Sequence, residues 1–130
     1  MSDLTLSSGL EDYLECIYNN IEHNGSVKAI ELSRELNVSR ASVTDALHRL
    51  AEKKYINYER YGSIEITSKG IEKATEVIGK HTILTKFFEK VLKLSNEEAS
   101  ENACSIEHVI TQNAFKKLKD FTQQYAGKND

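Results

Sequence analysis

The chain has 130 residues and a formal net charge of −3, which is enough for one domain or for two small ones that share a long helix. It has no apolar run near the ~20 residues that a membrane span needs, and its start does not resemble a signal peptide. These features predict a cytoplasmic protein without a membrane partner. Two cysteines, Cys16 and Cys104, are too few for a disulfide framework and fit a reducing compartment.

Charge is unevenly distributed along the sequence. Residues 1–24 carry five acids and no Lys or Arg, residues 25–93 carry thirteen bases against nine acids, and residues 94–130 carry four bases against six acids. A basic middle segment between acidic ends favours a polyanionic partner. The same excess is also common on an ordinary solvated surface.

Apolar side chains at helical spacing predict two helices near the start of the chain. The first covers residues 8–23 and stops at Asn24-Gly25. The second is short, and its apolar face consists of Ala29, Leu32 and Leu36. A three-residue turn over 37–39 follows it.

A third helix is predicted over residues 40–54, with Ser39 as its N-cap. The period then changes to two, because apolar residues alternate with polar ones on both sides of Gly62. This pattern indicates a β-hairpin with its turn at Gly62. The order of elements over residues 28–67 is that of a winged helix-turn-helix.

Three further helices are predicted in the second half. One runs over 68–92 from a cap at Thr67-Ser68, one runs from Ser95 to about 109, and one runs from Thr111 to about Tyr125, followed by a frayed tail. The predicted fold class is therefore mainly α: a winged helix-turn-helix of three helices and a hairpin, then an all-α unit of about three helices.

The third helix carries the pattern expected of a DNA-reading element. In a helix-turn-helix, the N-terminal half of the second helix enters the major groove, where small hydroxyls and donors reach the base edges. The residues predicted on that face are Ser39, Arg40, Ser42, Thr44 and Asp45. Arg49, with Lys53 and Lys54, continues a basic strip for phosphate, and Arg60 is placed at the hairpin tip. The alternative is an ordinary capped surface helix, and Asp45 would repel phosphate unless it accepts from a cytosine amino group.

Six residues with metal-ligand chemistry occur in three separated segments: Asp12, Glu15, His81, Cys104, Glu107 and His108. On one helix, the spacings i, i+3 and i, i+4 would let Cys104, Glu107 and His108 face the same ion. Carboxylate, imidazole and thiolate are ligands of first-row metals, so the set predicts a metal site. Each residue taken alone could equally belong to the surface or the core.

Five segments together resemble the diphtheria toxin repressor family of metal-dependent transcription regulators: 10–18, 42–50, 58–62, 66–70 and 103–109. The resemblance covers residues 8–122 and implies a winged-helix DNA-binding domain at 1–70, then a metal-binding and dimerisation domain at 71–130. Members of the family that respond to iron usually carry a third, SH3-like domain, and with 130 residues this chain is expected to lack it. The implied function is a homodimeric repressor of metal-uptake genes that binds a palindromic operator in double-stranded DNA, not an enzyme.

The ligand positions resemble the manganese transport regulator branch most closely. That branch has Asp and Glu on the first helix, His on the long helix, and Glu, Glu and His on the fifth. Cys104 stands where that branch has Glu and the iron-responsive branch has Cys, whereas Asp12 stands where the iron-responsive branch has Met. The ancillary metal site of the iron-responsive branch would fall on Thr85 and Ser100, which replace its Glu and His, with Glu101 as a substitute donor.

Carboxylate and imidazole donors favour Mn²⁺ and Fe²⁺, and a thiolate favours softer ions. Mn²⁺ is therefore the first expected effector and Fe²⁺ the second, while Co²⁺, Ni²⁺ or Zn²⁺ is expected to bind in vitro. If Cys104 binds through its backbone carbonyl instead, an oxygen donor replaces the sulfur and the site favours Mn²⁺ more strongly. Three other functions stay open: a winged-helix regulator of a small organic ligand, a metallohydrolase, and a structural DNA-binding protein without an effector.

Overall fold

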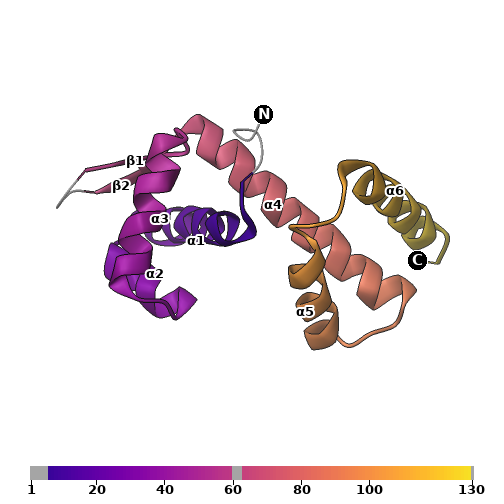
Figure 1. Ribbon diagram of the computed structural model, residues 1–130. Helices are drawn as coiled ribbons and strands as arrows, with labels where there is room; N and C mark the ends of the chain where they lie inside the picture. Colours follow the sequence, from indigo (N-terminus) through magenta and orange to yellow (C-terminus); the bar gives the residue numbers. More distant parts are fainter. Residues whose placement is uncertain (1–5, 60–62, 130) are drawn as a thin grey trace. The chain divides into compact units, whose positions relative to one another are not determined.

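The computed structural model describes residues 6–59 and 63–129. Contacts divide the chain into two compact units, Met1–Thr75 and Glu76–Asp130, and helix α4 (Ser68–Lys86) contributes to both. Figure 1 shows the helices and the single hairpin of the described residues. None of these helices is both long enough and apolar enough to cross a membrane.

Helix α1 (Ser8–Asn24) begins and ends at capping residues. The Ser7 hydroxyl accepts a hydrogen bond at 3.3 Å from the backbone amide three residues on. Gly25 ends the helix with a left-handed φ of 83°. One face of the helix buries Leu14 and Ile17 completely. The helix predicted over residues 8–23 is therefore confirmed.

Helices α2 (Ala29–Leu36) and α3 (Arg40–Glu52) form the helix-turn-helix. Asn37 has a φ of 54°, and this left-handed residue reverses the chain between the two helices. The Ser39 hydroxyl then caps α3 by accepting from the Ser42 amide at 3.1 Å. The inner face of α3 buries four apolar residues, Val43, Ala46, Leu47 and Leu50. Both predicted helices and the predicted Ser39 cap are confirmed.

The wing consists of strands β1 (Ile56–Tyr58) and β2 (Ile64–Ile66), which pair antiparallel with Ile56 opposite Ile66. The hairpin drawn beside α3 in Figure 1 confirms the predicted change of period. Arg60 and the turn predicted at Gly62 lie outside the described residues.

A close backbone approach at Gly70 joins the base of the wing to the start of α4. A Cβ at this position would lie 2.1 Å from the Tyr55 carbonyl oxygen, so only glycine fits. The same carbonyl accepts from the Thr67 amide at 3.0 Å. The Thr67 hydroxyl accepts from the Gly70 amide at 3.0 Å, which confirms the predicted start of the long helix.

The second unit contains the later part of α4, the π-helical turn η2 (Phe87–Val91), α5 (Asn96–Ile106) and α6 (Gln112–Asn129). Helix α5 is capped by Ser95, whose hydroxyl accepts from a backbone amide at 3.2 Å. The Thr111 hydroxyl caps α6 in the same way, also at 3.2 Å. Both predicted helix starts are confirmed.

Helix α3 ends at Glu52, two residues before its predicted end, and three helix ends in the second half of the chain also differ from the sequence predictions. The long helix does not stay α-helical to residue 92, because the Leu92 amide bonds to the Phe87 carbonyl and this wider spacing makes a π turn. Helix α5 ends at Ile106, three residues earlier than the predicted end near 109. Helix α6 continues to Asn129 where fraying was predicted, and this segment contains no proline to stop it.

Candidate nucleic-acid interface and metal centre

The outer face of α3 carries the residues predicted to read DNA. Those that the structure describes are all exposed: Ser39, Arg40, Ser42, Thr44, Asp45 and Arg49. Their hydroxyls bond locally, since Thr44 donates to the Arg40 carbonyl at 3.1 Å and Ser39 donates to the Ser42 hydroxyl at 3.0 Å. Exposed hydroxyls can exchange such bonds for bonds to a base edge at little cost.

Asp45 is paired with Arg49 on the same helix. The Arg49 Nε lies 2.9 Å from the Asp45 Oδ2, and the two side chains are 63% and 65% exposed. The pair offsets the repulsion that Asp45 alone would exert on phosphate. An exposed i, i+4 pair is worth only ~0.3–0.5 kcal/mol, so it can open when either partner meets DNA.

A hollow of about 810 Å³ lies between α3, the wing and the start of α2. Its walls include Lys28 before α2, Arg40, Thr44 and His48 on α3, and Tyr58 on β1. Among the described residues, none that lines this hollow is acidic, although the chain as a whole carries a net negative charge. The His48 and Tyr58 rings, with centroids 5.7 Å apart, connect α3 to the wing.

The polar residues Lys28, His48 and Tyr58 in the wall of this hollow were not predicted from the sequence. One signal was available for His48, because Arg40, Thr44 and His48 recur every four residues and so share one face of α3. The contribution of Lys28 depends on the tertiary approach of α2 to the wing, which no local pattern encodes.

The basic strip predicted along α3 is divided in the structure. Lys53 and Lys54 do not contribute to the large hollow and instead line a smaller one of about 320 Å³ with Glu52 and Lys69. The Lys69 Nζ donates to the Lys53 carbonyl at 2.8 Å. These lysines are therefore not brought together with Arg40.

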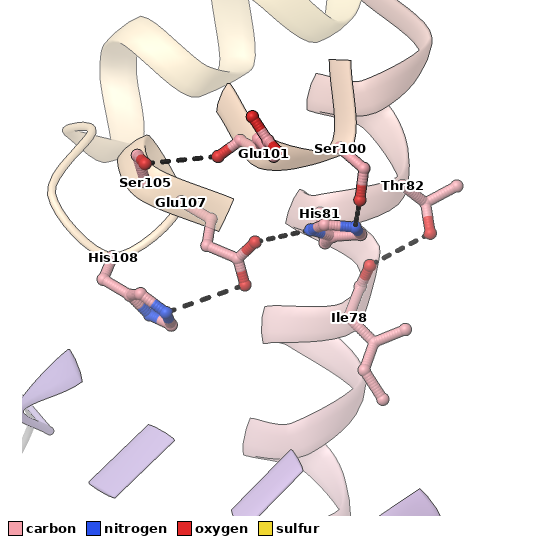
Figure 2. A network of polar contacts seen from close by, with 8 residues as sticks. All are labelled: Ile78, His81, Thr82, Ser100, Glu101, Ser105, Glu107 and His108. Carbon is pink, nitrogen blue, oxygen red and sulfur yellow. Dashed lines mark hydrogen bonds and ion pairs between the residues drawn. The ribbon is translucent and has the colours of Figure 1, made fainter. Parts of the chain in front are cut away.

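In the second unit, a buried carboxylate lies between two imidazoles (Figure 2). Glu107 follows the last residue of α5 and is only 3% exposed. Its Oε1 lies 2.7 Å from the His81 Nδ1 on α4, and its Oε2 lies 3.8 Å from the His108 Nε2. Two nitrogen donors and a carboxylate form a donor set suited to a first-row metal.

The other predicted ligands, Asp12, Glu15 and Cys104, do not belong to this group of one glutamate and two histidines. Cys104 is exposed on α5. Asp12 is exposed and Glu15 half-buried on α1, in the first unit. Across residues 6–59 and 63–129, no three His, Cys, Asp or Glu side chains lie ready-made around a metal position. The full ligand set therefore stays a prediction.

The residues around Asp12 and Glu15 anchor α1 within its own unit. The Lys73 Nζ lies 3.4 Å from the Glu11 Oε2, and both side chains are largely buried. The Cys16 thiol donates to the Glu35 Oε2 on α2 at 2.8 Å. Burial and this hydrogen bond raise the pKa of the Cys16 thiol to about 12, and the bond lowers the pKa of Glu35. Cys16 thus acts as a neutral thiol that ties α1 to α2.

The fold and the two sites define a class: a winged helix-turn-helix protein with a cationic hollow, followed by a helical unit in which a buried glutamate lies between two histidines. Residues 5–64 match the family described as "Iron dependent repressor, N-terminal DNA binding domain". Residues 67–127 match "Iron dependent repressor, metal binding and dimerisation domain". The chain belongs to this iron-dependent repressor family, which confirms the resemblance drawn from its motifs.

Relatives support the assignment. An uncharacterized HTH-type transcriptional regulator of Methanocaldococcus jannaschii is 38% identical over 124 residues, covering 95% of this chain and 99% of that protein. The HTH-type transcriptional regulator MntR of Oceanobacillus iheyensis is 29% identical over 116 residues, covering 89% and 78%. These relatives are transcriptional regulators.

Solved structures share the fold. The manganese regulator SloR aligns with a TM-score of 0.77 at 23% identity, over 88% of this chain and 53% of that one. The IdeR of T. acidophilum aligns with a TM-score of 0.73 at 26% identity, over 85% and 52%. The chain thus spans about half the length of these structures.

Proposed function

We propose that this metal-dependent, DNA-binding transcriptional repressor responds to Mn²⁺, with Fe²⁺ as the second choice, and regulates metal-uptake genes. The proposed ligands are Asp12, Glu15, His81, Cys104, Glu107 and His108. The observation that carries the proposal is the buried Glu107 carboxylate, which has an imidazole nitrogen on either side. Manganese regulators among the relatives and structural neighbours support the choice of metal.

A bound divalent ion supplies positive charge at a carboxylate that burial otherwise disfavours. His81, Glu107 and His108 would hold the ion in the second unit. Asp12 and Glu15, on α1, are the other proposed donors. In a two-fold dimer, metal binding would favour the spacing of the two recognition helices that DNA requires, since these helices must meet half-sites about one helical turn apart or a multiple of it.

DNA is proposed to meet the outer face of α3 and the hollow beside it. Ser39, Ser42, Thr44 and Asp45 would face base edges, while Arg49, Arg60 and Arg40 would contact phosphates. Lys28 adds a second cationic side chain beside Arg40 in the wall of the hollow, and His48 adds a ring that can form a hydrogen bond. The operator is proposed to be palindromic, matching the symmetry of a homodimer.

The metal proposal is tested by fluorescence anisotropy of a selected DNA duplex under anaerobic conditions, with chelator, Mn²⁺ or Fe²⁺ added at fixed salt. We expect metal to tighten binding and chelator to reverse it. Glu107→Ala and His108→Ala should lose this stimulation while remaining folded by circular dichroism. Glu97→Gln, at an exposed acid in the first turn of α5, is the control. Stimulation retained in both site variants would contradict the proposal.

The DNA interface is tested by the salt dependence of affinity, because each phosphate contact contributes about −0.9 to the slope of log affinity against log salt. Arg40→Ala and Lys28→Ala should each make the slope less steep by about one unit without changing Mn²⁺ affinity. Lys80→Ala, on α4, is a control of equal charge. An unchanged slope in Arg40→Ala and Lys28→Ala would exclude the hollow as a phosphate site.

The role of Cys104 is tested with Co²⁺, since a thiolate ligand gives a sulfur-to-metal charge-transfer band. We expect the band in the wild type and its loss in Cys104→Ser. Cys104→Glu should shift selectivity from Zn²⁺ toward Mn²⁺, because a harder donor replaces sulfur. Identical spectra for the wild type and Cys104→Ser would exclude a thiolate ligand. The backbone carbonyl would then be the remaining way for Cys104 to bind the metal.

A further inference from the structure

His48 lies on α3 beyond the residues predicted to read bases. It is eight residues after Arg40, in the second half of the helix, whereas a recognition helix contacts base edges mainly from its N-terminal half. Its side chain is exposed and lines the hollow of about 810 Å³ between α3, the wing and the start of α2. At this place a polar ring is suited to the sugar–phosphate backbone of DNA rather than to a base edge.

The wall around His48 is cationic and holds the ring in place. Among the described residues that line the hollow, Lys28 and Arg40 are the charged ones, and Tyr58 is the titratable residue of the wing. The imidazole and the Tyr58 ring are tilted by 45° with their centroids 5.7 Å apart. This contact limits the freedom of the imidazole before a ligand arrives, which lowers the entropy that binding costs.

Four acids are close to His48 in the sequence or belong to the wing, and none of them lines the hollow: Asp45, Glu52, Glu59 and Glu65. Asp45 is bonded to Arg49 at 2.9 Å. Glu52 lines the smaller hollow with Lys53. Glu59 and Glu65 each follow a residue of the large hollow, and successive side chains of an extended chain point to opposite faces. Among the described residues of the hollow, His48 therefore has no carboxylate partner.

We propose that His48 takes up a proton from solvent when DNA enters the hollow and, as an imidazolium, donates a hydrogen bond to a backbone phosphate. The inference rests on the proposed function, because it requires DNA to meet this hollow. Histidine is the side chain whose charge ordinarily changes between about pH 5 and 8, and a neighbouring anion favours its charged form. Lys28 and Arg40 oppose that charge in the free protein, and a bound phosphate reverses the balance. DNA affinity should therefore gain a contact as the pH falls.

The proposal is tested by anaerobic fluorescence anisotropy of a selected duplex with saturating Mn²⁺ at fixed salt, at about pH 6 and about pH 8. The readout is the ratio of the dissociation constants of His48→Gln and wild type. Both proteins contain the proposed metal ligands, so any effect of pH on the metal site cancels in this ratio. We expect a ratio of roughly one at the higher pH and about tenfold at the lower, as for loss of one charge-assisted hydrogen bond. The same ratio at both pH values would overturn the proposal.

Two further variants separate the charge of His48 from its packing against the wing. His48→Arg carries a permanent charge, so its affinity should stay at the low-pH level across the range. His23→Gln removes an exposed histidine in the last turn of α1, outside the hollow, and should keep the wild-type pH profile. A His48→Arg protein that loses affinity with rising pH as steeply as wild type would overturn the proposal.

Calorimetry in two buffers of different ionisation enthalpy measures proton uptake directly. At about pH 7, DNA binding by wild type should take up more protons per site than binding by His48→Gln. Equal uptake would overturn this inference alone, provided that Lys28→Ala and Arg40→Ala make the salt slope less steep. Unchanged slopes in those two variants would instead contradict the proposed place of DNA in the hollow.

Discussion

The two units differ in the size of their apolar interiors, although each buries two polar side chains among the described residues, Glu11 and Asn20 in the first unit and Glu107 and Thr122 in the second. In the first unit the largest fully buried side chains are all apolar: Leu14, Ile17, Leu32, Val43, Leu47, Leu50 and Ile56. In the second unit Leu84 is buried to the same degree with the small Ala99 and Ala103, while the polar Glu107 and Thr122 are also buried.

On the surface the difference is reversed, because the second unit exposes more of its large apolar side chains than the first. In the second unit Leu92, Val109 and Phe121 are 50%, 74% and 51% exposed, whereas the most exposed large apolar residues of the first unit, Ile30 and Ile71, reach 37% and 41%. A unit with a sparse apolar interior and apolar side chains outside gains burial by association. The first unit therefore holds the larger apolar core, and the exposed apolar side chains of the second fit the dimerisation domain that its family description names.

The comparison predicts that the largest stability loss follows truncation in the first unit. Leu47 is fully buried in α3, so Leu47→Ala should lower the free energy of unfolding by about 2–5 kcal/mol. Leu92→Ala, at a half-exposed position of the second unit, should cost well under 1 kcal/mol in the monomer. Urea titration at low protein concentration measures both, and equal losses would remove the distinction between the units.

A second variant addresses association. Phe121→Ala removes an exposed aromatic ring from α6, and burial of such a side chain is worth roughly 1.5–3 kcal/mol. The dimer dissociation constant should therefore rise tenfold or more in sedimentation equilibrium. Ile71→Ala, in the first unit, is the control and should sediment as the wild type does. Wild-type sedimentation of Phe121→Ala would exclude this surface from the interface.

A third variant tests how the recognition helix is fixed. Ser39→Ala removes the hydroxyl that accepts from the Ser42 amide, so unfolding should become easier by ~1 kcal/mol. Ser95→Ala removes the corresponding cap of α5 in the second unit. Thermal unfolding should show similar small shifts in both, because caps act locally; a shift several times larger in either variant would show that its cap also supports tertiary packing.

The last prediction concerns Cys16, whose effect on stability becomes pH-dependent only in alkaline solution. Its pKa rises from 9.0 to about 12, so the folded state holds the proton more tightly than the unfolded chain. The stabilisation is complete below pH 9.0 and is lost as pH rises toward about 12. Unfolding free energies measured across this window should decline less steeply in Cys16→Ala than in wild type. Parallel declines would mean that the Glu35 contact does not hold the proton.

Most of the fold could be predicted because its signals are local. Gly25, Ser39 and Ser95 sit at helix ends where capping chemistry is readable in sequence, and the alternation in β1 and β2 marks the wing. The π turn at Phe87–Val91 was not predictable, since the hydrogen-bond shift that creates it leaves the residue pattern nearly helical.

The types of residue in the site could be predicted from the sequence, but their arrangement in space could not. Glu107 and His108 were identified by residue type and spacing. The contact between Glu107 and His81, which are 26 residues apart in the sequence, depends on the tertiary fold. Ser100 was expected only as a missing ligand, and its contact with the far side of the same imidazole requires the tertiary fold.

The π turn η2 also has an evolutionary consequence. A π turn accommodates one residue more than the α-helical ladder needs, which is the signature left by a single-residue insertion. Deleting one residue there would turn the π turn into an ordinary α-helical turn and leave the residues after it in the same register. Loss of a single codon in this stretch should thus be tolerated better than loss of one in the regular part of α4, where each residue removed would rotate all that follows by about 100°.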